Sequence, residues 1–125
     1  MLRKIETAED LDFTKLKDEQ SRAPIVPVIV VDEAVLLKRG LEGIYMVGFA
    51  TQEAVQATID TGLVTFFSRS RQKLWTKGET SGNTLQAVNL YTDCDKDTLL
   101  ISATAAGPVC HNGTGSCFET PAVGQ

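Results

Sequence analysis

This chain contains six short apolar segments, and their length and spacing limit the folds that it can adopt. Each is mostly apolar and contains β-branched or aromatic residues, a composition typical of buried strands. The segments span 27–32, 34–39, 44–50, 63–70, 85–93 and 97–105. We expect the last two to pair with each other across a turn at 93–97.

Local signals mark both ends of a helix expected at 51–62. Thr51 is an N-cap candidate, Val55 and Ile59 lie four residues apart on one helix face, and Gly62 is a stop signal. One clear helix among about six strands predicts an α+β, mainly β fold. We therefore expect a small mixed-sheet domain with one or two short helices.

The chain length of 125 residues suits one domain, 1–125, and is too short for two separate cores. Residues 1–22 are mostly polar and predict a lead-in with one weak helix beginning at Thr7. Residues 69–83 predict a loop rich in functional groups. Residues 106–125 are glycine-rich and lack hydrophobic periodicity, so we expect a bound metal to order them.

Charge and hydropathy exclude several functional classes. The net charge of −4 argues against non-specific nucleic-acid binding. The longest apolar run, 23–31, is about half of the ~18–20 residues that span a membrane and contains two prolines. Acidic residues near the N-terminus do not suit a signal peptide. We expect a cytoplasmic protein with no nucleic-acid or membrane partner.

The chain has three cysteines, Cys94, Cys110 and Cys117, and none belongs to a C-x-x-C pair. An odd number does not suit a secreted disulfide framework. Three protein ligands with one open position are typical of a catalytic zinc site. Small buried cysteines that pack as apolar residues explain the spacing equally well.

His111 is the single histidine and directly follows Cys110. A lone histidine is more often structural than catalytic. Its place beside a candidate metal ligand favours a catalytic role, because histidine is the side chain that normally changes charge near neutral pH.

The stretch DCDKD at 93–97 places Asp93, Asp95 and Asp97 around Cys94. Like charges this close repel unless a cation or solvent relieves them. An EF-hand loop would also need glycine and glutamate at its sixth and twelfth positions, which are threonines here. A solvated turn is the simpler interpretation. In an extended backbone the three carboxylates would share one face, suited to Mg²⁺, and the thiol would point to the other, suited to zinc.

Three blocks in this order and spacing resemble the phosphoribosyl-AMP cyclohydrolase family. They are FFSRSRQKLWTKGETSG at 66–82, DCDKDTLL at 93–100 and GPVCHNGTGSCF at 107–118. The resemblance extends over about 24–119. The family usually has tyrosine, methionine and asparagine where this chain has Phe49, Ala50 and Thr51, and a histidine where it has Asn83.

The resemblance implies an enzyme of L-histidine biosynthesis, a metal-dependent cyclic amidine hydrolase. Such an enzyme opens the adenine ring of phosphoribosyl-AMP at the C6–N1 bond with zinc-activated water, and the product is the phosphoribosylformimino-AICAR phosphate intermediate. The resemblance also implies zinc on Cys94, Cys110 and Cys117, with ligands drawn from both subunits of an interlocked homodimer. It places Mg²⁺ on Asp93, Asp95 and Asp97. His111 would donate the proton to the departing nitrogen.

Many members of the family carry a second, C-terminal phosphoribosyl-ATP pyrophosphohydrolase domain. This sequence stops at Gln125. We therefore expect a stand-alone cyclohydrolase without that second activity.

The substrate's two phosphates need cations and hydrogen-bond donors, and the 66–82 block is rich in both. Arginine offers bidentate forks to phosphate. Without the resemblance, a solvated strand end would be the better interpretation of the SRSR run, and a lone tryptophan is more often a core anchor than a base-stacking residue. The predicted substrate-binding residues are Ser68, Arg69, Ser70, Arg71, Trp75, Lys77, Gly78, Glu79, Thr80 and Ser81.

Two alternatives belong to other classes. A zinc nucleobase deaminase needs H-x-E and a later P-C-x-x-C, and this chain has neither motif. A non-enzymatic, zinc-stapled dimeric nucleotide-binding module would use the same cysteines for structure alone.

Overall fold

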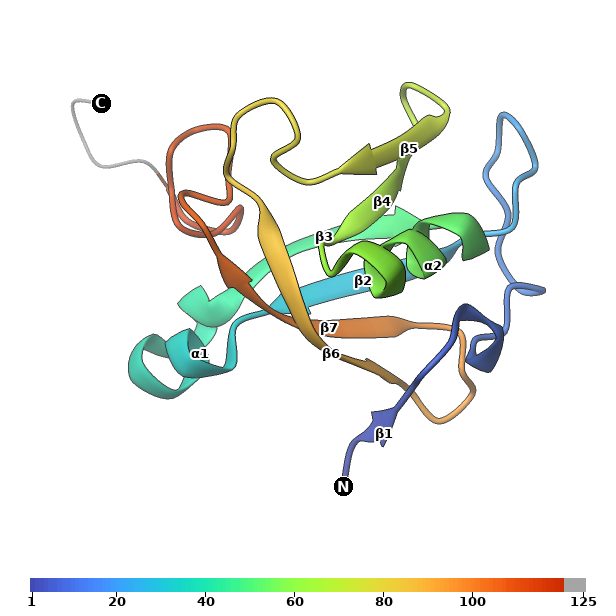
Figure 1. The fold of residues 1–125 in the computed structure, drawn as a ribbon, viewed down its shortest axis with the longest axis horizontal. Helices are drawn as coiled ribbons and strands as arrows, with labels where there is room; N and C mark the ends of the chain where they lie inside the picture. The colour runs from blue at the N-terminus through green and yellow to red at the C-terminus, as the bar shows by residue number, and fades with distance from the viewer. Residues whose placement is uncertain (121–125) are drawn as a thin grey trace.

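The computed structural model describes residues 1–120. It contains a five-stranded mixed sheet in the order β1-β6-β7-β2-β3 (Figure 1). Only β2 and β7 run parallel, and the other neighbours are antiparallel. This arrangement confirms the predicted α+β, mainly β class. The strands of this sheet are β1 (Arg3–Lys4), β2 (Val26–Val31), β3 (Ile44–Ala50), β6 (Leu85–Thr92) and β7 (Leu99–Ala105).

Helix α2 (Gln52–Thr61) lies across one face of this sheet (Figure 1). The Thr51 hydroxyl accepts a hydrogen bond from the Ala54 amide, and Gly62 ends the helix with a left-handed backbone (φ 77°). Both predicted ends of the helix are therefore confirmed. The Thr58 hydroxyl donates to the Ala54 carbonyl and accepts from the amide of Thr65, which fixes the helix to the next strand.

The core fills the space between α2 and the sheet. Alternate residues of β2 are buried, and they pack with apolar residues from β6, β7 and the helix. Its most deeply buried members include Val28, Val30, Val55, Val64, Leu85, Leu99 and Ile101. None of the helices in residues 1–120 is long and apolar enough to cross a membrane.

The prediction of a strand at 34–39 is wrong, because these residues lie in helix α1 (Glu33–Arg39). Asp32 caps this helix, because its carboxylate accepts hydrogen bonds from the amides of Ala34 and Val35. No residue of α1 is buried. The helical structure of 34–39 is therefore set by the cap at Asp32 and by the turn that follows, η2 (Gly40–Gly43). Hydrophobic burial does not set it.

The segment 69–83, predicted as a loop, contains strand β5 (Lys73–Thr76). It pairs with β4 (Thr65–Ser68) in a separate two-stranded sheet. The Phe66 and Trp75 rings face each other across this pair with centroids 5.9 Å apart. The aromatic pair supplies the packing that such a short hairpin needs.

The polar lead-in at 1–22 is part of the folded domain, because β1 pairs with β6 and Ile5, Ala8 and Leu11 are buried. Its predicted weak helix is a single turn, η1 (Ala8–Asp10), preceded by Thr7. The Asp10 carboxylate accepts the Thr7 amide proton.

Hydrogen bonds hold the glycine-rich tail against β3, and the ordering of this tail by a bound metal stays a prediction. The Ser116 hydroxyl donates to the Ile44 carbonyl, and the Cys117 amide donates to the Tyr45 carbonyl. Val109 and Ser116 are fully buried. The end of the predicted tail, 121–125, lies outside the described residues.

Candidate active site and metal sites

A cavity of about 410 Å³ lies between the chain after β5 and the loop after β7. Its size falls within the usual range for small-molecule sites. Most of the predicted substrate-binding residues line it, together with Cys110, His111 and Asn83. The predicted residues found there are Arg71, Trp75, Lys77, Gly78, Glu79, Thr80 and Ser81.

The loop at 77–83 owes its shape to Gly78. Its backbone is left-handed (φ 81°), and a side chain there would collide with the backbone of Asn83. The Gly82 amide donates to the Gly78 carbonyl and closes the loop. Thr80 and Ser81, in this tight turn, line the cavity.

Two cations flank the indole of Trp75 at the cavity. The Lys77 ammonium lies 5.4 Å and the Arg71 guanidinium 6.0 Å from the ring centroid. The indole also lies beside the core ring of Phe66. Trp75 is thus a core anchor that also lines the cavity, and it supports a positively charged wall.

The SRSR run divides at a tight turn, where Gln72 adopts a left-handed backbone (φ 55°). Arg71 reaches the cavity. Arg69 points elsewhere: its guanidinium lies over the Phe49 ring and donates to Asp18 at 3.1 Å. Ser68, Arg69 and Ser70 do not line the cavity of this chain.

Asp18 orders this turn and was not among the predicted site residues. It is 2% exposed and accepts hydrogen bonds from the Ser21 amide, Gln72 and Arg69. These bonds, led by that from the Ser21 amide, hold the pKa of Asp18 well below its usual range. No local motif could reveal this role, because Asp18 is more than fifty residues from its partners in the hairpin.

Cys110 and Cys117 lie close enough to influence each other's ionisation. A hydrogen bond from the Asn112 backbone lowers the pKa of Cys110. Partial desolvation and the neighbouring Cys110 raise the pKa of Cys117. The Cys110 Sγ also lies 4.0 Å from Nδ1 of the exposed His111. The structure therefore brings Cys110 and the single histidine together at the cavity, with the thiol of Cys117 next to that of Cys110.

Cys94 lies at the other end of the β6–β7 hairpin, in the turn between the strands (Figure 1). The seven residues of β7 separate this turn from the loop that holds Cys110. At ~3.3 Å per residue, that separation is on the order of 20 Å. Within residues 1–120, the three thiols of one chain do not form a single metal-binding group.

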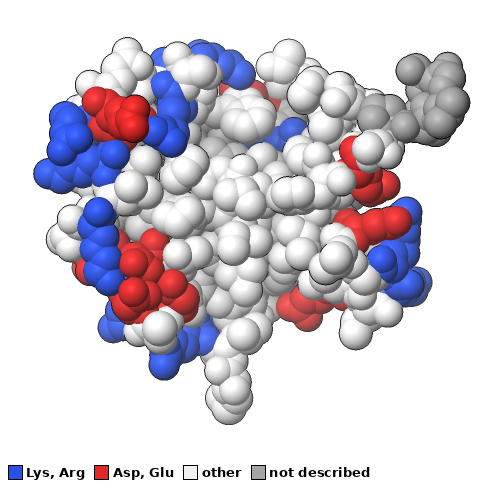
Figure 2. Space-filling view, turned by 180° about the vertical axis from the view of Figure 1, so that it is seen from behind, with Lys and Arg blue, Asp and Glu red and all other residues white. Residues whose placement is uncertain are grey.

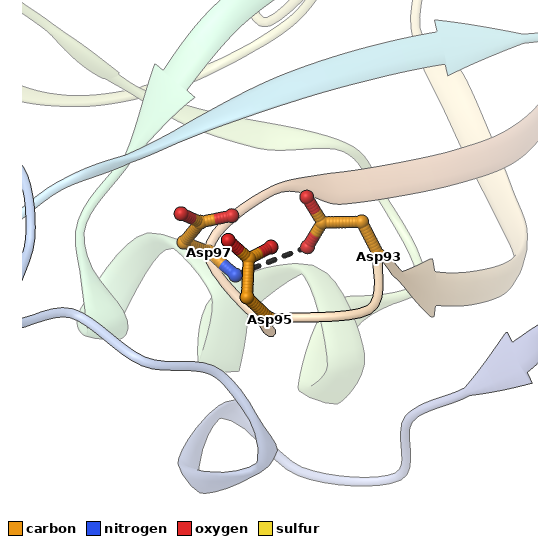
Figure 3. Close-up of side chains that lie close together, drawn as sticks. All are labelled: Asp93, Asp95 and Asp97. Carbon is orange, nitrogen blue, oxygen red and sulfur yellow. Dashed lines mark hydrogen bonds between the residues drawn. The ribbon is translucent and has the colours of Figure 1, made fainter.

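Asp93, Asp95 and Asp97 converge on one side of the same turn (Figure 3). Carboxylate oxygens from the three residues lie within 4.8 Å of one another. Burial and the adjacent carboxylates raise the pKa of Asp97. Hydrogen bonding, first with Asp97 and then with Lys15, lowers the pKa of Asp95. Three clustered oxygen donors match the preference of Mg²⁺.

The predicted turn at 93–97 is confirmed, and the extended backbone considered as the alternative is not formed, although the three carboxylates do meet. Residues 94–96 form a turn in which Lys96 has a left-handed backbone (φ 63°). The Asp93 carboxylate accepts a hydrogen bond from the amide of Asp97 (Figure 3) and another from the amide of Thr98. Curvature, rather than strand alternation, brings the three acids together.

Comparison with known proteins places this arrangement in a family. The profile of the family described as PRA-CH, phosphoribosyl-AMP cyclohydrolase, matches residues 46–119. The chain belongs to this cyclohydrolase family. The match covers the cavity, the acidic turn and all three cysteines.

Relatives of this cyclohydrolase-family chain include several proteins named "Histidine biosynthesis bifunctional protein HisIE". The protein from Bacteroides thetaiotaomicron is 47% identical over 109 residues, which are 87% of this chain and 48% of the relative. That from Escherichia coli K12 is 52% identical over 85 residues, 67% of this chain and 42% of the relative. That from Vibrio cholerae is 48% identical over 102 residues, 82% of this chain and 46% of the relative. The chain thus spans about half the length of these relatives.

Proposed function

We propose that this protein hydrolyses the C6–N1 bond of phosphoribosyl-AMP, in histidine biosynthesis. The observation that carries the proposal is the single cavity that joins His111 and Cys110 to Arg71 and Lys77. Family membership supports the same reaction. The residues of the cavity supply a proton donor, a metal ligand and cations for phosphate in one place.

Arg71 and Lys77 bind phosphate of the substrate in this proposal. Both line the cavity near the indole of Trp75, and each carries a full positive charge. The adjacent loop adds the hydroxyls of Thr80 and Ser81. Arg69, held by Asp18 and Phe49, supports the turn that carries Arg71.

His111 supplies the proton that the reaction requires. When water adds at C6 and the C6–N1 bond breaks, the departing nitrogen must gain a proton. An imidazole can hold and release a proton near neutral pH. His111 is exposed at the cavity, so its ring is accessible to a bound substrate.

The donor set fits two different metals. Cys110 and Cys117, with Cys94 from a second chain, would hold zinc, because soft thiolates suit it. Bound zinc supplies Lewis acidity that lowers the pKa of water toward ~7. Asp93, Asp95 and Asp97 would hold Mg²⁺ through hard oxygen ligands.

A homodimer completes the zinc site in this proposal, because Cys94 is too far from the other two thiols of its own chain. The sheet face turned away from α2 offers a surface for the second copy. Ile29, Val47 and Leu100 are neighbours across adjacent strands, and Val47 is 51% exposed. Figure 2 shows this side of the molecule, where charged side chains lie around the rim of a broad uncharged centre.

The test is an ultraviolet assay of ring opening with phosphoribosyl-AMP. Protein stripped of metal is given zinc, Mg²⁺ or both, and we expect turnover only with both ions. Cys110→Ser should abolish turnover together with zinc binding. His111→Ala should reduce turnover by roughly 10²–10⁴-fold, the usual contribution of general acid–base catalysis, and leave the zinc content unchanged.

Asn112→Ala is the matched control, because it changes the exposed neighbour of His111 in the same loop. It should retain most of the activity. Absence of turnover under every metal condition, with zinc bound tightly, would overturn the proposal. The chain would then be a zinc-stapled nucleotide-binding module.

A further inference from the structure

We propose that Lys15 is a built-in counter-cation of the acidic turn, and that a divalent ion must displace it to bind. The Lys15 ammonium lies 3.3 Å from Asp95 and 3.4 Å from Asp97. It therefore occupies the negative field in which Asp93, Asp95 and Asp97 would bind Mg²⁺. This inference rests on the magnesium site of the proposed function and adds a residue that controls its affinity.

The backbone on both sides of Lys15 is held in place by hydrogen bonds, and this positions Lys15 beside the acidic turn. The Asp12 amide donates to the Lys96 carbonyl at 2.7 Å, so the segment contacts the acidic turn directly. On the other side of Lys15, the Ile25 amide donates a hydrogen bond to the Leu16 carbonyl, with a nitrogen–oxygen distance of 3.0 Å. Contacts on both sides hold the lysine within reach of the carboxylates.

The space beside the carboxylates suits a partly hydrated ion. A cavity of about 230 Å³ adjoins the turn and is lined by Lys15, Asp97 and Asp12, among others. Magnesium usually keeps several waters when it binds to one or two carboxylates. Of the three clustered acids only Asp97 lines this cavity, and Asp12 adds a second carboxylate to its lining.

A single ammonium only partly satisfies this cluster. Lys15 contacts Asp95 and Asp97 but makes no ion pair with Asp93, and it carries one charge against three. A divalent ion can approach all three carboxylates and carries twice the charge. The ammonium lies on two of the three carboxylates that the metal would use, so in this proposal the metal displaces Lys15 when it binds.

Removal of the ammonium should therefore strengthen metal binding. Lys15 and Asp95 are substantially exposed, so each ion pair is individually weak. We expect Lys15→Met to raise the affinity for Mn²⁺, used as a spectroscopic substitute for Mg²⁺, about three- to tenfold. Lys15→Arg keeps the charge and should bind Mn²⁺ with nearly the affinity of the natural protein.

The experiment measures free aqueous Mn²⁺ by electron paramagnetic resonance during titration of the zinc-loaded full chain. Competition with Mg²⁺ tests whether both ions share the site, and Asp95→Asn should weaken binding at that site. Lys17→Met is the matched control, because Lys17 is two residues away and forms no ion pair within residues 1–120. Circular dichroism melts verify that each variant is folded.

An unchanged or weaker Mn²⁺ affinity in folded Lys15→Met would overturn the inference. So would an equal gain in Lys17→Met, or the absence of any Mn²⁺ binding that depends on Asp95. The readout is metal binding alone, so it is independent of the ring-opening assay. If Lys15→Met did not raise the Mn²⁺ affinity but turnover were normal, the role of Lys15 would be overturned and the proposed reaction would stand. If the affinity rose but no turnover were found, the role of Lys15 would stand and the proposed reaction would be overturned.

Discussion

At the scale of single residues, Asp32 joins two elements of the fold. Its carboxylate caps α1 and also accepts a 2.8 Å hydrogen bond from the buried Tyr45 hydroxyl. Burial, followed by the hydrogen bond to Asp32, raises the pKa of Tyr45 to about 12. The tyrosine thus ties β3 to the cap of α1 while it remains protonated.

Tyr45→Phe should lower the free energy of unfolding by about 1.5–3 kcal/mol, the usual contribution of a hydrogen bond to a charged group. Because the pKa of Tyr45 is higher in the folded protein than the ~10 of an unfolded tyrosine, its contribution is complete below pH 10. The contribution is then lost as pH rises through about 12. Urea denaturation from pH 7 to 12 measures both effects.

Tyr91→Phe provides the control for this change. Tyr91 lies in β6 and is only partly buried, and its hydroxyl makes no hydrogen bond within the described residues. Removal of the Tyr91 hydroxyl should leave the free energy of unfolding nearly unchanged. Equal losses in the two variants would contradict the role assigned to the bond with Asp32.

The residues that sequence reasoning missed share a physical cause. Lys15 meets Asp95 across eighty positions of the chain, and Asp18 meets Arg69 across fifty-one. No periodicity or local motif reports such pairings, since they exist only after the chain folds. Cys110 and His111, by contrast, are adjacent in sequence and stand out in a short motif.

At the scale of elements, prediction succeeded where the deciding signals are local. Helix α2 carries its own cap, apolar spacing and glycine stop, so its limits were predictable. Segment 34–39 has strand-like apolar residues, but the Asp32 cap makes it a helix. Strand β5 is short and depends on pairing with β4, which no local pattern within 73–76 reveals.

The cavity loop offers a test at this scale, because two of its glycines have similar backbones and different surroundings. Gly78 (φ 81°) has no room for a side chain, whereas Gly82 (φ 83°) has open space. Gly78→Ala should deform the loop, destabilise the protein by more than ~1 kcal/mol and weaken binding of AMP. Thermal melts and calorimetric titration with AMP measure these changes.

Gly82→Ala is the matched variant. It carries the same left-handed strain, roughly 1 kcal/mol, without the collision with Asn83. It should destabilise the protein less and bind AMP nearly as well as the natural chain. If both variants lost AMP binding equally, the cavity would not depend on the packing of Gly78.

At the scale of the whole molecule, the hairpin of β6 and β7 separates the thiols that family resemblance assigns to one zinc ion. Cys94 lies at one end, and Cys110 and Cys117 lie beyond the other. The three cysteines lie in the sequence blocks that resemble the family and within the matched residues 46–119, yet their spacing alone could not show this separation. The distance between Cys94 and the other two thiols follows from the length of β7, and it prevents the three thiols of one chain from binding the same zinc ion.

A mixing experiment tests whether the thiols are shared between subunits. Cys94→Ser and Cys110→Ser should each be inactive alone, because every site in either homodimer lacks one ligand. In a mixed dimer, one site combines Cys110 and Cys117 of the first chain with Cys94 of the second, so it is intact. Random exchange of equal amounts should then restore about a quarter of the natural activity per site.

The control for this experiment mixes Cys110→Ser with Cys117→Ser. These two thiols lie in the same loop of one chain, so every site in the mixed dimer still lacks one of them. Activity should stay at the level of the separate variants. Recovery in this control, or its absence in the first mixture after subunit exchange is verified by mass spectrometry, would contradict a zinc site shared in the way proposed. Recovery in the first mixture alone requires that residues from opposite ends of the hairpin meet across the subunit interface.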